Sequence, residues 1–415
     1  MQPQPGPAAG KTDTAGRHKT TKEKKDPYMK ILHTSDWHLG HTLYNYDRTE
    51  EQSAMLQQMA AIVAAERPDL FLLCGDVYHT AQPAAAVQTM LTDALVRLHE
   101  AHPAMCVVIT AGNHDSGTRH EIFRSAWRAL NVHAVGSLSK ERPDDHIIPV
   151  GDKGFVVAVP YANERHLHDG FFQELLDRAA ERNAERLPVV LTAHTTVHGC
   201  DFSGHDHATE YTVGGIDALR VEQMGQGYDY LALGHIHREQ WVHCDGRSVR
   251  YSGTPLAVSF DENYPHTVSM VEIDRHGDTP SVRTIPVDNA RPPVTLPTKG
   301  TAPWEEAKAL LRAFPDDIAA YIRLNVETDD FLPSEANAEA AALTQGKACR
   351  FCHINVKRKS TQRGGERTLT VQEFQAEAPL DIACRYAEDI GRTFDEEMKS
   401  VFNEAFEMVQ SDMRN

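Results

Sequence analysis

The sequence predicts an α/β fold of β-sheets flanked by helices, followed by a small α+β domain and C-terminal helices. Between Lys30 and about Pro286, short apolar runs rich in β-branched residues alternate with segments of helical periodicity. After about residue 287 an amphipathic helix precedes strands in which apolar and polar residues alternate. The predicted strands of the first region are 31–32, 70–74, 107–110, 189–192 and 230–233, and its clearest helices are 52–66 and 87–100.

Composition places the chain among globular proteins of two or three domains. It has 415 residues, of which 41% are apolar and 24% charged, and its seven cysteines are scattered. Neither a run of 18 apolar residues nor a secretory signal is present, so we expect a cytoplasmic protein without a membrane span. The net charge of -17 argues against a broad basic surface for nucleic acid, unless bound cations or a partner supply positive charge.

Changes in composition and in hydrophobic periodicity divide the sequence into four segments. Residues 1–28 are rich in Pro, Gly, Thr and Lys and are predicted to be a disordered tail. The α/β domain is expected over 29–286 and the small domain over 287–370, where a basic stretch after residue 356 is either a solvated loop or a phosphate contact. Segment 371–415 is helical, and its apolar stripe is compatible with packing on its own domain or on a partner.

Polar residues gather where the predicted strands end. In open α/β sheets, ligands bind just beyond the carboxyl ends of the strands. An Asp or a His at one such end is commonly a helix cap or a surface residue, and this chain has 23 histidines. Caps and surface residues do not readily explain five polar clusters that each follow a predicted strand. The oxygen and nitrogen atoms of these clusters suit Mn²⁺, Fe²⁺ or Zn²⁺ as ligands. The clusters are Asp36 and His38; Asp76 and His79; Asn113, His114 and Asp115; His194; and His235 and His237.

This ordered set of motifs, D-x-H, G-D, G-N-H-D, H and G-H-x-H, resembles the calcineurin-like metallophosphoesterases. The flanking residues narrow the resemblance to the SbcD nucleases of that superfamily. They are residues 33–40, then Tyr44, Asp47 and Arg48, and finally 251–255 with Ser259 and Phe260. The similarity is strong over residues 29 to about 275, and it implies a metallophosphoesterase sandwich of β-sheets with a small capping domain.

The resemblance implies a site for two divalent ions. Asp36, His38 and His237 would hold one ion, Asn113, His194 and His235 would hold the other, and Asp76 would bridge them. The family uses two Mn²⁺, with Mg²⁺ or another divalent ion possible.

Three more residues receive catalytic roles from the resemblance. His114 would act as the general acid that protonates the leaving oxygen. Asp115 is placed to orient that imidazole, or else to cap a helix. His79 would lie near the phosphate.

The resemblance further implies a metal-dependent DNA nuclease, with 3′-to-5′ exonuclease activity on duplexes and endonuclease activity on single strands and hairpins. It would act in DNA repair, replication and recombination with a coiled-coil ATPase of the SbcC type, as a homodimer within a heterotetramer. Residues 287–370 would cap the nuclease domain, and 371–415 would bind the ATPase. The alternatives are a phosphodiesterase of the same fold acting on a small phosphodiester, and a DNA-bound scaffold with an inactive site.

Two other motifs are interpreted as structural. Cys349, Cys352 and His353 match the haem-attachment pattern C-x-x-C-H, but they lie in a predicted strand. The sequence His205-Asp-His207 follows no strand, and we interpret it as loop.

Overall fold

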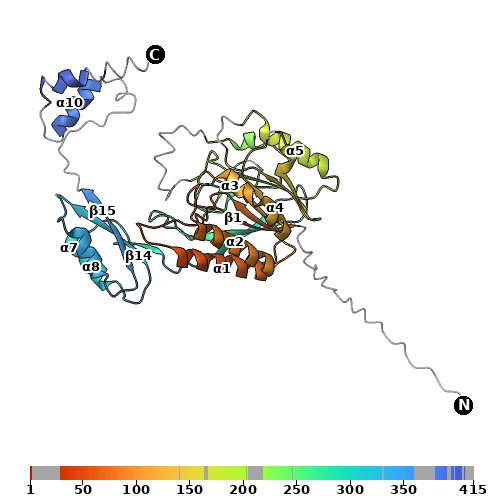
Figure 1. Ribbon diagram of the computed structural model, residues 1–415, viewed down its shortest axis with the longest axis horizontal. Coiled ribbons are helices and arrows are strands. Elements are labelled where there is room, and N and C mark those ends of the chain that lie inside the picture. The colour runs from red at the N-terminus through yellow and green to blue at the C-terminus, as the bar shows by residue number, and fades with distance from the viewer. Residues whose placement is uncertain are drawn as a thin grey trace. The chain divides into compact units, whose positions relative to one another are not determined.

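The computed structural model describes most of the chain between Met29 and Arg358 (Figure 1). The described residues are Met1, 29–139, 141–162, 167–201, Ser203, 218–244, 246–329, 331–358, 379–389, 394–396, 398–403 and Phe406. The predicted tail up to residue 28, the segment His205–His207 and the basic stretch from 359 onward lie outside them. The chain forms two compact units, residues 1–357 and 358–415.

Two six-stranded sheets form the first part of the larger unit. The first sheet has the order β12-β11-β1-β2-β3-β4, in which β1 to β4 are parallel and β11 is antiparallel to β1. Its strands are β1 Met29–Thr34, β2 Leu70–Cys74, β3 Cys106–Thr110, β4 Val132–Val135, β11 Thr267–Ile273 and β12 Ser281–Pro286.

The second sheet has the order β5-β6-β7-β8-β10-β9, in which β6, β7, β8 and β10 are parallel. Its strands are β5 Ile147–Val150, β6 Gly154–Ala158, β7 Val189–His194, β8 Tyr230–Gly234, β9 Gln240–Val242 and β10 Val249–Tyr251.

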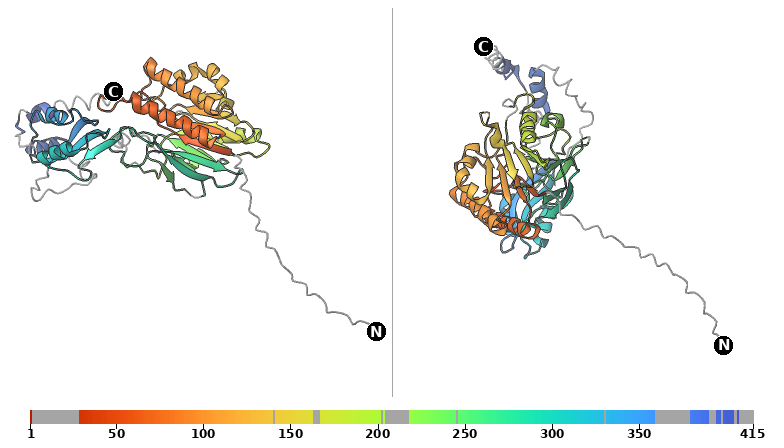
Figure 2. Two further views of the ribbon diagram at one scale, coloured as in Figure 1. Left: turned by 90° about the horizontal axis from the view of Figure 1, so that it is seen from below. Right: turned by 90° about the vertical axis from the view of Figure 1, so that its right-hand side faces the viewer.

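The sheets pack face to face with helices on their outer faces (Figure 2). Fully buried side chains from both sheets, including Ile31, Leu70, Val190 and Tyr230, form one apolar cluster between them. Helices α1 and α2 cover the outer face of the first sheet, and α5 covers that of the second. Helix bounds are α1 Thr49–Glu66, α2 Ala85–Ala101, α3 Gly117–Ile122, α4 Arg124–Trp127 and α5 Phe171–Arg182, with short 3₁₀ turns at Arg128–Leu130, Pro143–His146 and Val221–Met224. The predicted α/β sandwich is confirmed.

A small α+β region follows, with its own apolar cluster. Its sheet has the order β13-β14-β15. The elements are β13 Pro293–Leu296, α7 Trp304–Ala313, β14 Tyr321–Thr328, α8 Ala336–Leu343 and β15 Arg350–Arg358. This region contacts the sandwich: Tyr46 Oη donates to the carbonyl of Phe351 at 2.9 Å, and Tyr321 Oη donates to Glu51 at 3.0 Å. The boundary at residues 286 and 287 remains a prediction, as does the end of the domain at residue 370.

The C-terminal unit contains the helix α10, Pro379–Asp389, and a helical stretch over 398–403. Within it, the rings of Phe394 and Phe402 lie 6.2 Å apart, and those of Phe402 and Phe406 lie 6.4 Å apart. No helix in the described part of the chain is long and apolar enough to cross a membrane.

Candidate metal centre

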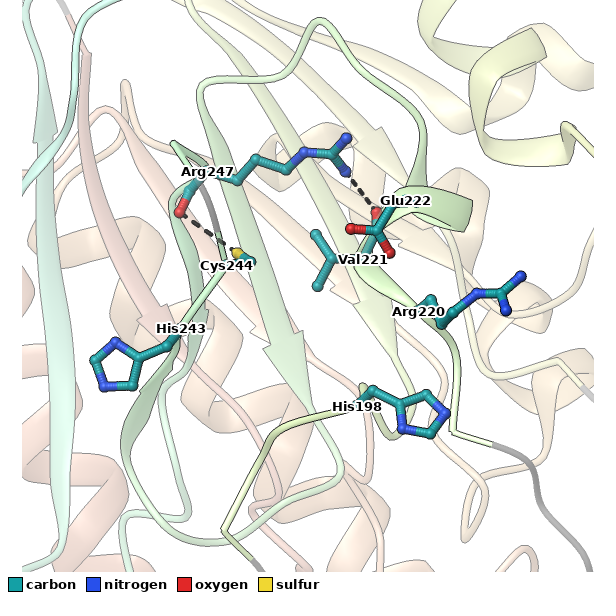
Figure 3. Close-up of a pocket in the computed structure, with 7 residues that line it drawn as sticks. All are labelled: His198, Arg220, Val221, Glu222, His243, Cys244 and Arg247. Atoms are coloured by element: carbon teal, nitrogen blue, oxygen red, sulfur yellow. Dashed lines mark hydrogen bonds between the residues drawn. The ribbon is translucent and has the colours of Figure 1, made fainter.

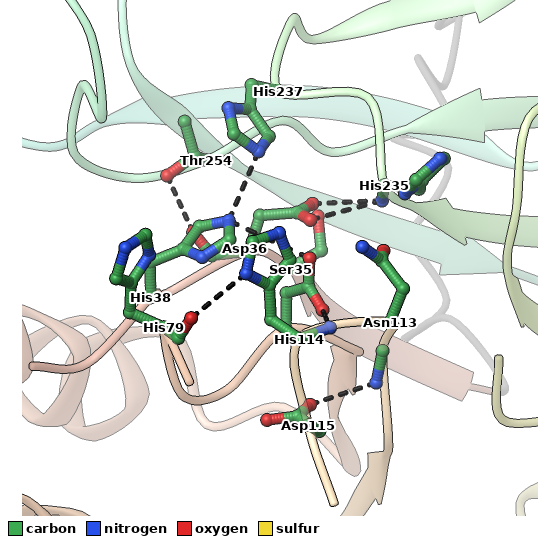
Figure 4. Close-up of polar contacts among 12 residues, drawn as sticks. Ser35, Asp36, His38, His79, Asn113, His114, Asp115, His235, His237 and Thr254 are labelled. Atoms are coloured by element: carbon green, nitrogen blue, oxygen red, sulfur yellow. Dashed lines mark hydrogen bonds and ion pairs between the residues drawn. The ribbon is translucent and has the colours of Figure 1, made fainter. Parts of the chain in front are cut away.

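The predicted ligands come from strand ends of both sheets (Figure 4). Asp36 and Asp76 follow the neighbouring parallel strands β1 and β2, and Asn113 lies in the loop after β3. His194 ends β7, and His235 and His237 follow β8, its parallel neighbour in the other sheet. Because the two sheets pack face to face, these strand ends meet at one edge of the sandwich.

One group of potential ligands comprises Asp36, His38 and His237, whose ligand atoms all lie within 4.8 Å of one another. All three side chains are buried. The Nε2 atoms of His38 and His237 are 3.2 Å apart. The main-chain N–H of His235 donates to both carboxylate oxygens of Asp36, at 3.2 and 3.1 Å, and so fixes that carboxylate between the sheets.

The second group comprises Asp76, His194 and His235, also within 4.8 Å. Asn113 Oδ1 lies 3.1 Å from His194 Nε2 and brings an amide oxygen to the same place. Asp76 Oδ2 is 3.4 Å from His194 Nε2 and 3.8 Å from His38 Nε2. Asp76 therefore lies between the two groups, at the position expected of a bridging ligand.

This donor set fits two divalent metal ions. Carboxylate oxygens, an amide oxygen and imidazole nitrogens suit Mn²⁺, Mg²⁺, Fe²⁺ and Zn²⁺. Buried carboxylates and imidazoles packed this closely are costly unless a cation or shared protons lie among them. Asp36, His38 and His237 suit one ion, Asn113, His194 and His235 suit the other, and Asp76 reaches both groups.

The backbone around the centre is strained. Asp36, His38, Asp76 and His235 have φ values of 54°, 44°, 48° and 97°. Non-glycine residues rarely adopt positive φ, and such strain concentrates at functional sites. All four lie in the loops that follow β1, β2 and β8.

Two glycines make room for the ligands. A Cβ on Gly75 would lie 2.1 Å from His194 Nδ1, and a Cβ on Gly112 would lie 2.1 Å from Asp76 Oδ1. Either contact would displace a potential ligand, so both glycines are required by close approach, and Gly75 also by its φ of 83°.

His114 lies beside both groups. Its ring centroid is 4.9 Å from that of His38, and its main-chain N–H donates to Asp76 Oδ1 at 2.9 Å. Its Nδ1 donates to the main-chain carbonyl of His79 at 2.9 Å, which leaves Nε2 as the atom able to give a proton to a substrate. The His79 ring stacks at 5.5 Å on that of His114, so His79 belongs to the same site.

Asp115 has a different place from the one expected. Its carboxylate accepts main-chain N–H groups of Gly112, Val77 and Tyr78 at 2.9 to 3.0 Å, and it lies 3.3 Å from His120 Nε2. The carbonyl of His79, rather than Asp115, holds the His114 ring. The direct orienting role is therefore wrong, because the carboxylate points toward the β2 loop. Asp115 instead ties the G-D loop to the G-N-H-D loop.

Comparisons with known proteins place this fold and centre in a family. Residues 29–239 match the calcineurin-like phosphoesterases. The chain is 32% identical over 369 residues to the SbcD component of the nuclease SbcCD from Rhodobacter capsulatus, covering 81% of this chain and 89% of that protein. This chain belongs to the SbcD family of calcineurin-like phosphoesterases. The corresponding SbcD proteins of Escherichia coli K12 and Bacillus subtilis are 28% and 29% identical, covering 85% and 74% of this chain and 90% and 81% of theirs.

Charge pairing dominates the second half of this SbcD-family centre. Burial opposes charge on His194, but Asp76 and Asp36 raise the pKa of its imidazole to about 9. Burial also opposes charge on Asp76, but His194, His38 and His114 hold the pKa of its carboxyl well below the usual range. A positively charged imidazole and an ionised carboxyl therefore stabilise each other at His194 and Asp76.

Three supporting contacts were not predicted from the sequence. His237 Nδ1 donates to Glu262 Oε1 at 2.8 Å, and His194 Nδ1 donates to the carbonyl of Cys74 at 2.8 Å. Both bonds leave the Nε2 atoms to face the centre, an arrangement that is common at metal-binding histidines. Arg48 Nη1 donates to His41 Nδ1 at 3.1 Å, and the His41 ring lies 4.6 Å from that of His79. Arg48 was recognised only as part of a flanking motif.

A separate pocket is lined by residues next to β9 and β10 and by the 3₁₀ turn Val221–Met224 (Figure 3). His198, Arg220, Glu222, His243 and Arg247 are among its lining residues. Arg247 Nη1 donates a hydrogen bond to the carbonyl of Val221 at 2.7 Å. None of these lining residues belongs to the groups that form the metal centre.

Proposed function

We propose that this chain is the metal-dependent DNA nuclease component of a complex of the SbcCD type, and that it hydrolyses phosphodiester bonds. The observation that carries the proposal is the position of Asp76 between two groups of metal donors, with His114 beside both. The relatives are named nucleases, and nuclease chemistry at neutral pH uses such paired sites.

Each part of the site has a distinct task in this proposal. Two divalent ions, for which we propose Mn²⁺, would neutralise phosphate charge and lower the pKa of the attacking water. By fixing the ions, the ligands would hold a phosphodiester at this edge of the sandwich. His114, held through Nδ1, protonates the leaving oxygen through Nε2.

Because the net charge of the chain is -17, most of the positive charge that attracts DNA would come from bound cations and partner proteins rather than from this chain's own surface.

We propose that residues 287–370 cap the nuclease domain and that 371–415 bind a coiled-coil ATPase, within a complex containing two copies of each chain. Met398 and Val401 of the C-terminal segment are 51% and 62% exposed, as partner contacts would be before assembly. The cysteines of the described residues form no disulfide, which suits the cytoplasm.

The deciding experiment is cleavage of a 3′-labelled linear duplex by the purified chain with Mn²⁺, Mg²⁺ or a chelator, alone and with its ATPase partner. We expect manganese-dependent loss of label. Failure to cut DNA under every condition, combined with turnover of bis-p-nitrophenyl phosphate, would instead identify a small-molecule phosphodiesterase.

A further inference from the structure

Three aromatic rings from distant parts of the chain meet at the contact between the sandwich and the small domain. Tyr44 stacks on His353 with ring centroids 4.1 Å apart and planes 17° apart, and its hydroxyl lies 3.2 Å from His353 Nε2. Phe260 lies 5.7 Å from Tyr44 and 5.8 Å from His353 and meets them at steeper angles. We call Tyr44, Phe260 and His353 the aromatic platform.

The aromatic platform is connected to the metal centre through two loops. Phe260 is two residues from Glu262, whose carboxylate holds His237. Tyr44 is three residues from His41, whose ring lies 4.6 Å from that of His79. Since a residue spans at most about 3.6 Å of chain, the Tyr44 Cα lies within roughly 22 Å of the His38 Cα. A strand cut at the centre would reach the aromatic platform within about six nucleotides, since each rises ~3.4 Å in a stacked strand.

The exposure of Tyr44 is unlike that of a packing residue. Its side chain is 47% exposed although His353 covers one face, whereas Phe260 beneath is 6% exposed. Tyr44 and the following Asn45 have φ values of 48° and 68°, a conformation that disfavours side chains larger than glycine. A strained backbone therefore presents a large ring toward solvent.

Joining the small domain to the sandwich does not require this exposed ring. Buried and partly buried contacts already do so: Tyr321 donates to Glu51 at 3.0 Å, Arg291 Nε donates to the same carboxylate at 3.1 Å, and Tyr46 donates to the carbonyl of Phe351 at 2.9 Å. Arg323 lies over the Phe260 ring at 5.2 Å and brings a guanidinium, paired with Asp261 at 2.7 Å, next to the aromatic platform. Aromatic rings beside cations are typical of surfaces that bind unpaired nucleotides.

We propose that Tyr44, stacked on His353 and supported by Phe260, is a platform on which an unpaired base of the DNA stacks while the strand enters the metal centre. This inference rests on the proposed nuclease function. It names the part of the substrate that the platform contacts, which is an unpaired nucleobase. Stacking tolerates any base, so the platform would favour frayed ends, single-stranded extensions and hairpin loops without sequence preference.

The test uses the full-length chain carrying His114→Ala, so that the DNA stays intact, with Mn²⁺ and a duplex whose single-stranded extension contains 2-aminopurine. Binding should quench the fluorescence of the unpaired base. Tyr44→Ala should abolish the quenching and weaken binding about tenfold, whereas Tyr44→Phe should retain both because the ring remains. Phe331→Ala, which removes a ring that is 80% exposed, is the matched control and should behave like the parent.

Equal quenching by the parent and Tyr44→Ala would overturn the inference. Equal loss in Tyr44→Phe and Tyr44→Ala would also overturn it, because the effect would then belong to the hydroxyl contact with His353. Thermal unfolding and Mn²⁺ stoichiometry, unchanged in Tyr44→Ala, exclude misfolding as the cause. A wild-type chain that neither binds nor cuts DNA would instead refute the proposed function, and the inference with it.

Discussion

Glu262 Oε1 lies 2.8 Å from His237 Nδ1, and this bond determines which nitrogen of His237 faces the metal centre. An ionised carboxylate can only accept, so Nδ1 carries the proton and Nε2 is left unprotonated as a ligand. The same Nε2 lies 3.2 Å from that of His38. Glu262 is 4% exposed, so the pairing is little weakened by solvent.

We therefore expect Glu262→Ala to lower affinity for Mn²⁺ by ~10- to 100-fold, the usual effect of removing such a partner. Glu262→Gln, which keeps an acceptor, should lose less. Isothermal titration calorimetry on the purified variants gives the affinities. Glu305→Ala, at a carboxylate whose side chain is 80% exposed, should bind Mn²⁺ like the wild type. Unchanged affinity in Glu262→Ala would show that the bond only packs the loop.

His114→Ala separates proton donation from metal binding. The ring is held by the His79 carbonyl and lies against His38. His38, His79 and His114 also lie close enough to hold an ion, but the groups of Asp36, His38 and His237 and of Asp76, His194 and His235 are each complete without His114. Both ions should still bind, while cleavage of duplex DNA falls by ~10²-fold or more, the usual contribution of a general acid. Single-turnover cleavage at saturating Mn²⁺ measures this. Normal cleavage by the variant would remove His114 from the mechanism.

Asp76→Ala should have a more severe effect, because one carboxylate faces both groups of ligands. Its Oδ2 lies 3.4 Å from His194 Nε2 and 3.8 Å from His38 Nε2. We expect calorimetry to show loss of at least one of the two Mn²⁺ and no detectable cleavage. Circular dichroism should show a folded chain. Two ions bound with wild-type affinity would contradict the bridging assignment.

Local patterns in the sequence were sufficient for the sandwich and for the side chains at its edge. Asp36, Asp76 and His194 each follow or end a short buried strand, and such strands are recognisable from apolar runs alone. Parallel pairing then brings their ends together. Glu262 could not be found in this way, because it lies in a loop and meets His237 only through folding.

The role of Asp115 shows the same limit. Asp115 was expected to orient the His114 imidazole directly. Its carboxylate instead accepts hydrogen bonds from three main-chain N–H groups of two loops. The direction of a side chain after a tight turn depends on such hydrogen bonds between loops, and these cannot be predicted from the sequence alone.

Proton release should accompany metal binding at His194. In the metal-free protein Asp76 and Asp36 raise the pKa of this imidazole to about 9, so at pH 7 it is protonated and must lose its proton before Nε2 can bind an ion. Apparent Mn²⁺ affinity should therefore rise with pH, about tenfold per unit between pH 6 and the pKa if one proton is displaced. Calorimetry in buffers of different ionisation enthalpy should detect about one released proton at pH 7. Asp76→Asn removes the carboxylate that raises the pKa of His194 most. His194 should then lose its proton at lower pH, and the affinity for Mn²⁺ should depend less on pH. A wild-type affinity that does not change between pH 6 and 9 would show that His194 is already neutral when the ion arrives.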